Sequence, residues 1–184
     1  MIIITDMNLD DQLLIKRSLK GEEKAIQLLY TRHKQYWFGI CLRYASSRFE
    51  ANDVFQEAVS RVFEKLHQFS PQKGSFKAWS NRIFVNAAFL YLKQHQWQQS
   101  FKDLDLAEDE VDMSESALGK ITAKELTQLI QQLPFGYRVV FNMREIEGYS
   151  HLEIAQMLDI SVGTSKSQLF KAKKALRAKI KILF

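Results

Sequence analysis

The sequence has little that would cross-link or interrupt it, with one cysteine, two prolines and seven glycines among 184 residues. A single cysteine cannot form an intramolecular disulfide, and Cys41 stands among apolar neighbours, where a small buried hydrophobe is a better interpretation than a reactive thiol. The segment Met1–Asp6 lacks the basic start and longer apolar core of a signal peptide, and no apolar run approaches membrane-spanning length. We therefore expect a cytoplasmic protein.

Residue patterns that are typical of enzymes are also missing. No metal-ligand spacing, nucleophile motif or phosphate-binding glycine loop occurs, and the four histidines are scattered along the chain. We expect no catalytic activity, no cofactor, no metal and no small-molecule substrate. The composition does include 46% hydrophobic residues, ample for folded cores, and a net charge of +5 with a pI near 9.2. That charge favours an anionic partner.

The stretch from Glu147 to Arg177 has the pattern of a helix-turn-helix. Ser150 followed by Glu153 is a capping box, in which each side chain satisfies an unpaired backbone N–H at a helix start. Asp159 can adopt the left-handed backbone of a tight turn, and Ser161 can cap the helix that follows. The buried stripe of the first helix is expected at Leu152, Ile154, Ala155 and Leu158.

The second helix of this motif carries charge of one sign. From Ser161 to Phe184 there are seven Lys or Arg and no Asp or Glu, while apolar residues recur on one side at helical spacing. A solvated basic face is the plain alternative, but the capping box, the short turn and the one-signed helix together favour DNA binding. Because the first residues of such a helix normally enter the major groove, base reading is expected at Thr164, Ser165, Lys166, Ser167 and Gln168.

The first half of the chain has the periodicity of almost continuous helix, including segments 10–19 and 22–38. In the stretch 51–66, Val54, Ala58, Val62 and Leu66 form an inward stripe, with Asp53, Gln56 and Glu57 together off that stripe. Acidic residues in a first turn favour the helix dipole, so Asp53 could be a cap. The same polar group could equally dock a basic partner, and the spacing leaves both interpretations open.

The loop Ser70–Ser75 and the helix expected over 76–97 also allow two interpretations. Pro71 discourages helix at Ser70, and Gly74 allows backbone geometries that other residues rarely adopt. Such a loop can cradle a nucleotide or simply turn the chain. The aromatic residues interleaved with cations in the helix suit stacking on unpaired bases, although aromatics at helical spacing are more often core. Core-like spacing is found at Trp79, Ile83, Phe84 and Leu90.

A change in composition divides the chain. Segment 102–115 contains seven acidic residues and few large side chains, which is the signature of a solvated linker. We expect an all-α protein with two small helical domains, over 1–97 and 121–184, joined by a flexible acidic linker over 98–120. A flexible linker allows both closed and extended arrangements of the two domains.

Three blocks in this order resemble the bacterial RNA polymerase sigma factors of the extracytoplasmic-function (ECF) group. The first is Ala51–Glu57 with Phe63, and the second is Phe76–Asn86. The third is discontinuous, comprising Leu133, Pro134, Arg138, Glu147, Gly148, Ser150, Glu153, Ile154, Ala155, Leu158, Ile160, Ser161, Gly163, Thr164, Lys166 and Ser167. The resemblance covers almost the whole chain, from about Asp11 to Leu176.

The resemblance implies a two-domain helical subunit, with a region 2 bundle and a region 4 helix-turn-helix, that directs core RNA polymerase to promoters. It implies docking on core polymerase through Asp53, Gln56 and Glu57. It places recognition and melting of the −10 element at Ser70, Gln72, Lys73, Ser75, Asn81, Arg82, Asn86 and Lys93. It places contacts to the −35 element at Lys166, Ser167, Phe170, Lys171 and Lys173, and an anti-sigma factor, in some cases membrane-bound, fits the family.

Several positions depart from the family pattern, among them Ser80, Leu90 and Asp159, where Leu, Asp and Gly are usual. Ser165 and Gln168 stand where Val and Arg are usual, so the preferred −35 sequence cannot be transferred from a relative. Gln168 could pair with adenine through two hydrogen bonds. The alternative function is a stand-alone helix-turn-helix regulator, which would bind its operator as a dimer without polymerase.

Overall fold

The computed structural model describes residues 10–100 and 122–183, and every regular element within these ranges is helical. The chain divides into two compact units. The first is the part through Leu90, apart from the short segment Leu42–Ser47, and the second contains the remaining residues. No helix among the described residues is both long enough and apolar enough to cross a membrane.

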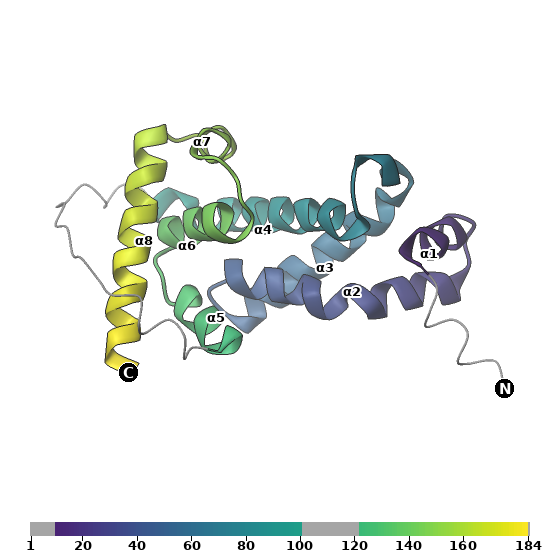
Figure 1. Ribbon diagram of the computed structural model, residues 1–184, viewed down its shortest axis with the longest axis horizontal. Helices are drawn as coiled ribbons and strands as arrows, with labels where there is room; N and C mark the ends of the chain where they lie inside the picture. The colour runs from purple at the N-terminus through teal and green to yellow at the C-terminus, as the bar shows by residue number, and fades with distance from the viewer. Residues whose placement is uncertain (1–9, 101–121, 184) are drawn as a thin grey trace. The chain divides into compact units, whose positions relative to one another are not determined.

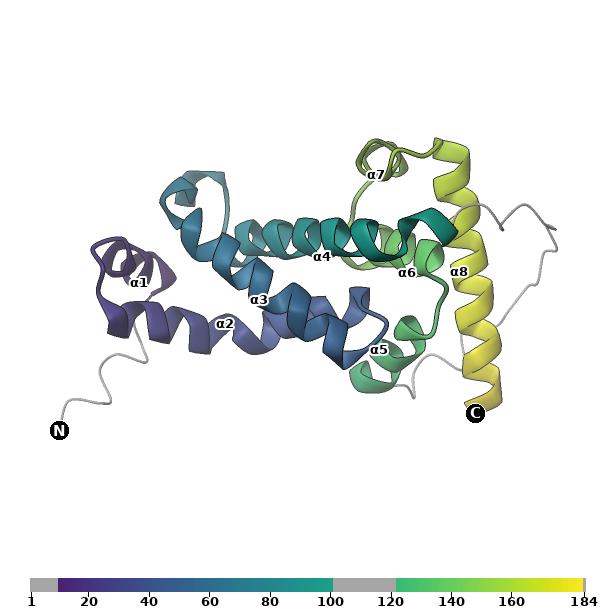
Figure 2. The ribbon, with the colours of Figure 1, turned by 180° about the vertical axis from the view of Figure 1, so that it is seen from behind.

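The first unit is a helical bundle in which α3 crosses between α2 and α4, as both views show (Figures 1 and 2). The helices of this part of the chain are, in order, α1 (Asp11–Ser18), α2 (Glu23–Tyr44), α3 (Arg48–Glu64), the 3-10 turns η2 (Leu66–Gln68) and η3 (Pro71–Lys73), and α4 (Phe76–Ser100). The last residues of α2 and the part of α4 beyond Leu90 are assigned to the second unit. The helix predicted to end at residue 38 continues to Tyr44, and Cys41 within it is buried as predicted.

Aromatic rings fill the core of the first unit. Trp37 is fully buried, stacks on Phe84 at 5.2 Å between ring centroids, and donates its indole N–H to Ser80 Oγ at 3.0 Å. Ser80 is fully buried as well, so the hydroxyl supplies the partner that a buried indole N–H requires. Leu90 differs from the prediction, because its side chain is 41% exposed rather than part of the core.

A buried histidine makes the stability of this unit depend on pH. His33 stacks on Trp37 at 5.3 Å, and its Nε2 lies 3.0 Å from Asp11 Oδ2. Burial lowers the pKa of His33 despite the opposing effect of Asp11. The unfolded chain has a histidine pKa of about 6.5, and the folded chain has a lower one. The neutral His33 therefore contributes to stability at pH values above about 6.5, and this contribution is lost as the pH falls through the folded-state pKa.

We expect the free energy of unfolding to decrease as the pH is lowered from about 7.5 to about 5.5, and His33→Phe to reduce that dependence. Urea-induced unfolding at a series of pH values measures both quantities. The variant also loses the contact with Asp11, which shifts its stability at every pH, so the slope is the informative quantity. Equal slopes for the two proteins would contradict the assignment.

The second unit comprises α5 (Ala123–Gln131), α6 (Phe135–Phe141), the π-helical turn η5 (Asn142–Ile146), α7 (His151–Leu158) and α8 (Val162–Leu183). Both views show α6 beside the middle of α8 and α7 near the start of α8 (Figures 1 and 2). One face of α5 packs on α8 through a cluster of Leu129, Ile130, Leu133, Ala172, Leu176 and Ile180. At about 25 cal/mol per Å² of apolar area, such burial is the main stabilising contribution.

A buried arginine completes the end of α5. Arg138 is 2% exposed, and its Nη1 donates to the carbonyl oxygens of Gln131 at 2.7 Å and Leu133 at 3.3 Å. A cation at a helix C-terminus satisfies carbonyl groups that have no partner within the helix and interacts favourably with the helix dipole. Arg138 therefore joins α5 to α6 across the break at Pro134.

The predicted linker lies mostly outside the described residues. Its first three positions, 98–100, belong to α4, which ends at Ser100, and positions 101–120 fall in the range that is not described. The acidic residues that predicted the linker are among the latter.

Candidate nucleic-acid interface

The helix-turn-helix forms through the three backbone signals that the sequence contains. Glu153 Oε2 accepts from Ser150 N at 2.7 Å while Ser150 Oγ accepts from Glu153 N at 3.2 Å, which closes the capping box. Asp159 then takes the left-handed conformation at φ 55° and ψ 49° and ends α7. Ser161 Oγ accepts from Thr164 N at 2.9 Å and caps α8. All three of these predictions are confirmed, but Leu152, predicted for the buried stripe of α7, is 60% exposed.

The start of α8 has one exposed and one buried face. Among the residues predicted to contact DNA, Lys166, Ser167 and Phe170 are exposed, whereas Thr164, Lys171 and Lys173 are half-buried. Lys173 Nζ lies 3.0 Å from Glu145 Oε1 of η5, so this cation is already paired within the unit.

Ser165 and Gln168 require a correction. Ser165 is fully buried and Gln168 is 2% exposed, because both lie on the side of α8 that continues into Ala172 and Leu176. Side chains on that face cannot reach the base edges of a duplex lying against the exposed face. Burial therefore removes Ser165 and Gln168 from the surface that we propose for base contact, together with the suggested pairing of Gln168 with adenine.

His151 also differs from expectation. A first helical residue directly after a cap usually faces solvent, but His151 at the start of α7 is half-buried and its Nδ1 lies 2.9 Å from Ser165 Oγ of α8. Burial, together with Arg144, Lys166 and Lys173, lowers the pKa of His151, whereas Glu145 opposes the shift. The ring is therefore neutral at neutral pH.

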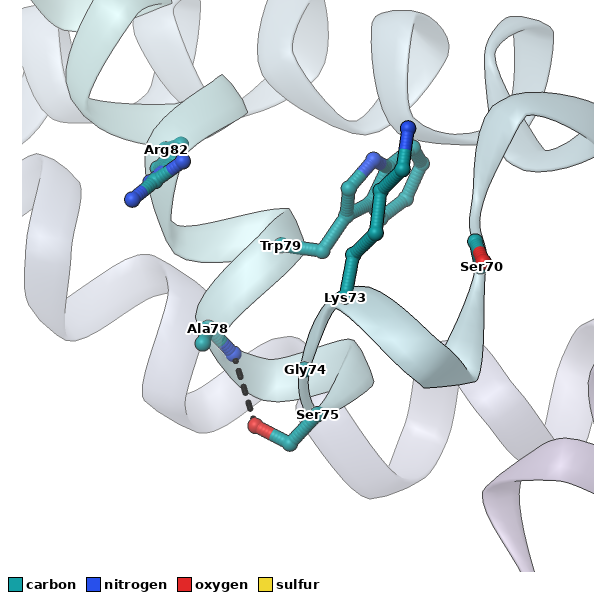
Figure 3. Close-up of a pocket in the computed structure, with 7 residues that line it drawn as sticks. All are labelled: Ser70, Lys73, Gly74, Ser75, Ala78, Trp79 and Arg82. Atoms are coloured by element: carbon teal, nitrogen blue, oxygen red, sulfur yellow. Dashed lines mark hydrogen bonds between the residues drawn. The ribbon is translucent and has the colours of Figure 1, made fainter.

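A pocket of about 180 Å³ lies where the predicted loop meets the start of α4 (Figure 3). Gly74 leaves η3 at φ 135°, a conformation that favours glycine, and Ser75 Oγ accepts from Ala78 N at 3.2 Å to cap α4. The pocket is lined by Ser70, Lys73, Gly74, Ser75, Ala78, Trp79 and Arg82. The loop and the first turns of α4 therefore line one concave surface.

The structure brings together four of the eight residues predicted for the −10 element, namely Ser70, Lys73, Ser75 and Arg82. The other four lie outside the pocket lining. Gln72 accepts a hydrogen bond from Ser70 Oγ at 2.6 Å, and Asn81 Oδ1 accepts from Tyr36 OH at 3.2 Å. Asn86 and Lys93 are exposed further along α4.

Trp79 is a pocket residue that sequence reasoning did not assign to the −10 element. It was assigned to the core, but the half-buried indole lines the pocket while its other contacts, with Phe69 at 5.7 Å and Phe76 at 5.6 Å, hold the ring in place. Figure 3 shows the Trp79 and Lys73 side chains on one side of the pocket and Arg82 on the other. The available signal was spacing, because Ser75, Trp79 and Arg82 recur at four and three residues along one helix face.

The polar face of α3 is the third candidate surface. Gln56 and Glu57 are exposed and Asp53 is half-buried, and Glu57 pairs with Arg61 one turn later. Because α3 begins at Arg48, Asp53 lies in its second turn. The alternative that Asp53 is a helix cap is therefore wrong.

Two family models match the two units. The model for Sigma-70 region 2 matches residues 29–98, and the model for Sigma-70, region 4 matches residues 123–176. The pocket and the α3 face lie in the first match and the helix-turn-helix in the second. A region 2 bundle followed by a region 4 helix-turn-helix defines the class of promoter-specificity subunits of RNA polymerase.

Comparison with whole proteins identifies the group within that class. The chain is 34% identical over 186 residues to the ECF RNA polymerase sigma-E factor of Escherichia coli strain K12, with 95% of this chain and 96% of the relative covered. It is 32% identical to the protein of the same description from Haemophilus influenzae, with 95% and 97% covered. The chain belongs to the ECF sigma factors, which bind core RNA polymerase and direct transcription initiation at promoters.

A solved structure supports the fold independently. The sigma factor RpoE of Bartonella quintana, determined in complex with the anti-sigma factor NepR, superposes with a TM-score of 0.52 at 16% identity. The comparison covers 90% of this chain and 98% of that chain.

Proposed function

We propose that this ECF sigma factor works through three surfaces: the polar face of α3 for core polymerase, the pocket at Ser70–Arg82 for the −10 element, and the exposed start of α8 for the −35 element. The observation that carries the proposal is the exposed, basic N-terminal part of α8. This helix belongs to a helix-turn-helix in which both helices have complete N-terminal caps. We propose domain boundaries at residues 1–97, 98–120 and 121–184.

At the −35 element, Lys166 and Ser167 are the base-reading side chains of this proposal. Lys166 is exposed in the second turn of α8 and can donate to the O6 and N7 edge of guanine. Phe170 offers an exposed apolar ring beside them, while Lys171 and Lys173 neutralise phosphates and thereby fix the register of the helix on the duplex. Thr164 is tied to the Ser161 cap through a 2.9 Å contact between the hydroxyl groups.

At the −10 element, the pocket holds a base that has left the duplex. Trp79 provides a ring face for stacking, which contributes about 1–3 kcal/mol per base, and Lys73 and Arg82 provide cations for the adjoining phosphates. The hydroxyl groups of Ser70 and Ser75 provide polar partners for the base edge. This binding offsets the few kcal/mol that unstacking costs, so strands separate without a catalytic group. We accordingly propose that the protein is not an enzyme and needs no cofactor.

Docking on core polymerase uses the carboxylates of Asp53 and Glu57 with the amide of Gln56. An acidic and amide face of this kind fits a basic, hydrogen-bonding surface. The cytoplasm is the compartment in which polymerase and promoter DNA are available, so we propose it as the location. Because a similar fold was determined with an anti-sigma factor, we also propose an anti-sigma partner for this chain.

Transcription from purified components tests the function. The full-length chain added to core polymerase should yield run-off transcripts from promoters selected with that holoenzyme, and core alone should yield none from them. Specific duplex binding by the chain without core, combined with no promoter-dependent transcript, would instead favour the stand-alone regulator.

Removing the carboxylate beside Lys173 should strengthen promoter binding. Glu145→Gln releases Lys173 from its 3.0 Å ion pair and removes a negative charge next to the DNA-facing side of α8. We expect about threefold tighter holoenzyme binding, with the slope of log K against log salt steeper by about one between about 50 and 200 mM salt. Glu23→Gln, at an exposed position on α2, is the charge-matched control. A salt slope unchanged by Glu145→Gln would argue against a phosphate contact by Lys173.

A further inference from the structure

The buried face of α8 is polar in the first two turns of the helix and apolar further along. From Ala172 onward it is apolar and packs on α5. In its first two turns the same face carries Ser165 and Gln168, which are 0% and 2% exposed. Polar groups on a buried helix face are costly unless they are hydrogen-bonded, so a polar start to this face calls for a specific partner.

For Ser165 that partner comes from the other helix of the motif, whereas the buried Oε1 of Gln168 has no hydrogen-bond partner among the described residues. His151 opens α7, and its Nδ1 lies 2.9 Å from Ser165 Oγ of α8. The buried residues of α7 are Ile154, Ala155 and Leu158, and all three are apolar. Apolar packing is non-directional and tolerates a small rotation of one helix against another, whereas a hydrogen bond restricts it.

Ser165 lies directly before the side chains that face the duplex. Lys166 and Ser167 are exposed, so the buried anchor and the reading residues are consecutive on one helix. A rotation of α8 by about 10° would move an atom about 6 Å from the helix axis by roughly 1 Å. A displacement of that size is comparable with the tolerance of a hydrogen bond to a base edge.

We infer that the hydrogen bond between the half-buried His151 and the buried Ser165 sets the rotation of α8 against α7, and that the two act as positioning residues for −35 discrimination. Both ends of the bond lie on backbone that is already fixed. The capping box of Ser150 and Glu153 holds the start of α7, and the Ser161 cap holds the start of α8. The bond therefore joins two rigid helix starts, and its loss affects their relative setting rather than the helices themselves.

Burial and the charged groups around the imidazole together favour its neutral form. Arg144 and Glu145 approach the ring from η5, and Lys166 and Lys173 from α8. Burial is the largest cause that lowers the pKa of His151. The three cations lower it further, and the one carboxylate, Glu145, opposes them. The neutral ring bonds Ser165 without placing another positive charge beside Lys166.

The test compares holoenzyme affinity for a promoter carrying its selected −35 element with affinity for the same promoter carrying a substituted −35 element. The ratio measures discrimination, which a loss of general stability or of phosphate contact leaves unchanged. We expect His151→Phe and Ser165→Ala each to lower the ratio about fivefold, the size expected for one hydrogen bond. The double variant should be no worse than either single variant, because both remove the same interaction.

Two further variants complete the design. His151→Asn keeps a polar atom near the position of Nδ1 and should restore most of the ratio. Thr127→Ala removes the 2.8 Å hydrogen bond from Thr127 Oγ1 to Ala123 O within α5, which joins no two helices, and should leave the ratio unchanged. Thermal unfolding of each variant reports any loss of folding separately.

The inference rests on the proposed −35 role, and the outcomes separate the two. If the wild-type holoenzyme discriminates but the single variants keep its ratio, the positioning inference is overturned and the proposed function stands. If the wild type shows no −35 discrimination, the assignment of α8 to the −35 element fails, and the positioning role fails with it.

Discussion

Replacing Asp53 and Glu57 together by arginine should lower the affinity of the chain for core polymerase by at least about 100-fold. The two residues share the polar face of α3, so the double reversal turns an acidic docking face into a basic one. Loss of a complementary charge in a buried interface costs about 2–5 kcal/mol, and like charges brought together add to that cost. Fluorescence anisotropy of the labelled chain titrated with core polymerase measures the change.

Folding should survive this double substitution. Glu57 is exposed and paired with Arg61 at the helix surface, and an exposed pair at this spacing contributes only about 0.3–0.5 kcal/mol. Asp10→Arg with Glu23→Arg changes the net charge equally, at the exposed residue that precedes α1 and at an exposed position of α2, and serves as the control. Equal losses of affinity in the two double variants would show a general charge effect and remove α3 from the interface.

Filling the pocket in the first unit should abolish promoter opening while core binding continues. Ala78 lines the pocket from the first turn of α4, and Ala78→Phe places a ring in the space of about 180 Å³ between Lys73, Trp79 and Arg82. The ring occupies the position that a flipped base needs, so the stacking contribution of about 1–3 kcal/mol is lost together with the polar contacts. We expect the rate of open-complex formation to fall about 100-fold or more.

Fluorescence of 2-aminopurine placed in the −10 element reports strand separation directly. Ala123→Phe, at the exposed first position of α5, is the matched control and should leave the rate unchanged. Because Ala78 is exposed, the substitution should alter the thermal stability of the unit little. Normal opening by the Ala78→Phe holoenzyme would mean that the −10 base is held elsewhere on α4.

Local signals in the sequence were enough for the helix-turn-helix. A capping box, a left-handed turn residue and a second cap each act within three or four residues, through hydrogen bonds between a side chain and nearby backbone. The structure accordingly has Ser150, Asp159 and Ser161 in their predicted roles. The composition and spacing of the chain also sufficed for an all-helical fold, because helix periodicity is a property of neighbouring residues.

The faces of the helices were less predictable. Ser165 and Gln168 were assigned by their place at the start of the second helix of the motif, and Leu90 and Leu152 by helical spacing. The structure has Ser165 and Gln168 buried but Leu90 and Leu152 exposed. Trp79 was assigned to the core, although its ring lines a pocket. Each of these errors concerns whether a side chain is buried against another helix or exposed.

The helices, the caps of the helix-turn-helix, the basic end of the chain and the family could all be predicted from residue order, since they depend on local hydrogen bonding, composition and ordered motifs. The bond between His151 and Ser165 across two helices, and the meeting of Trp79, Lys73 and Arg82 around one pocket, are seen only in the folded chain. Burial and pairing depend on how helices rotate and pack against one another. That rotation is set by contacts between residues far apart in the chain, which no local pattern records.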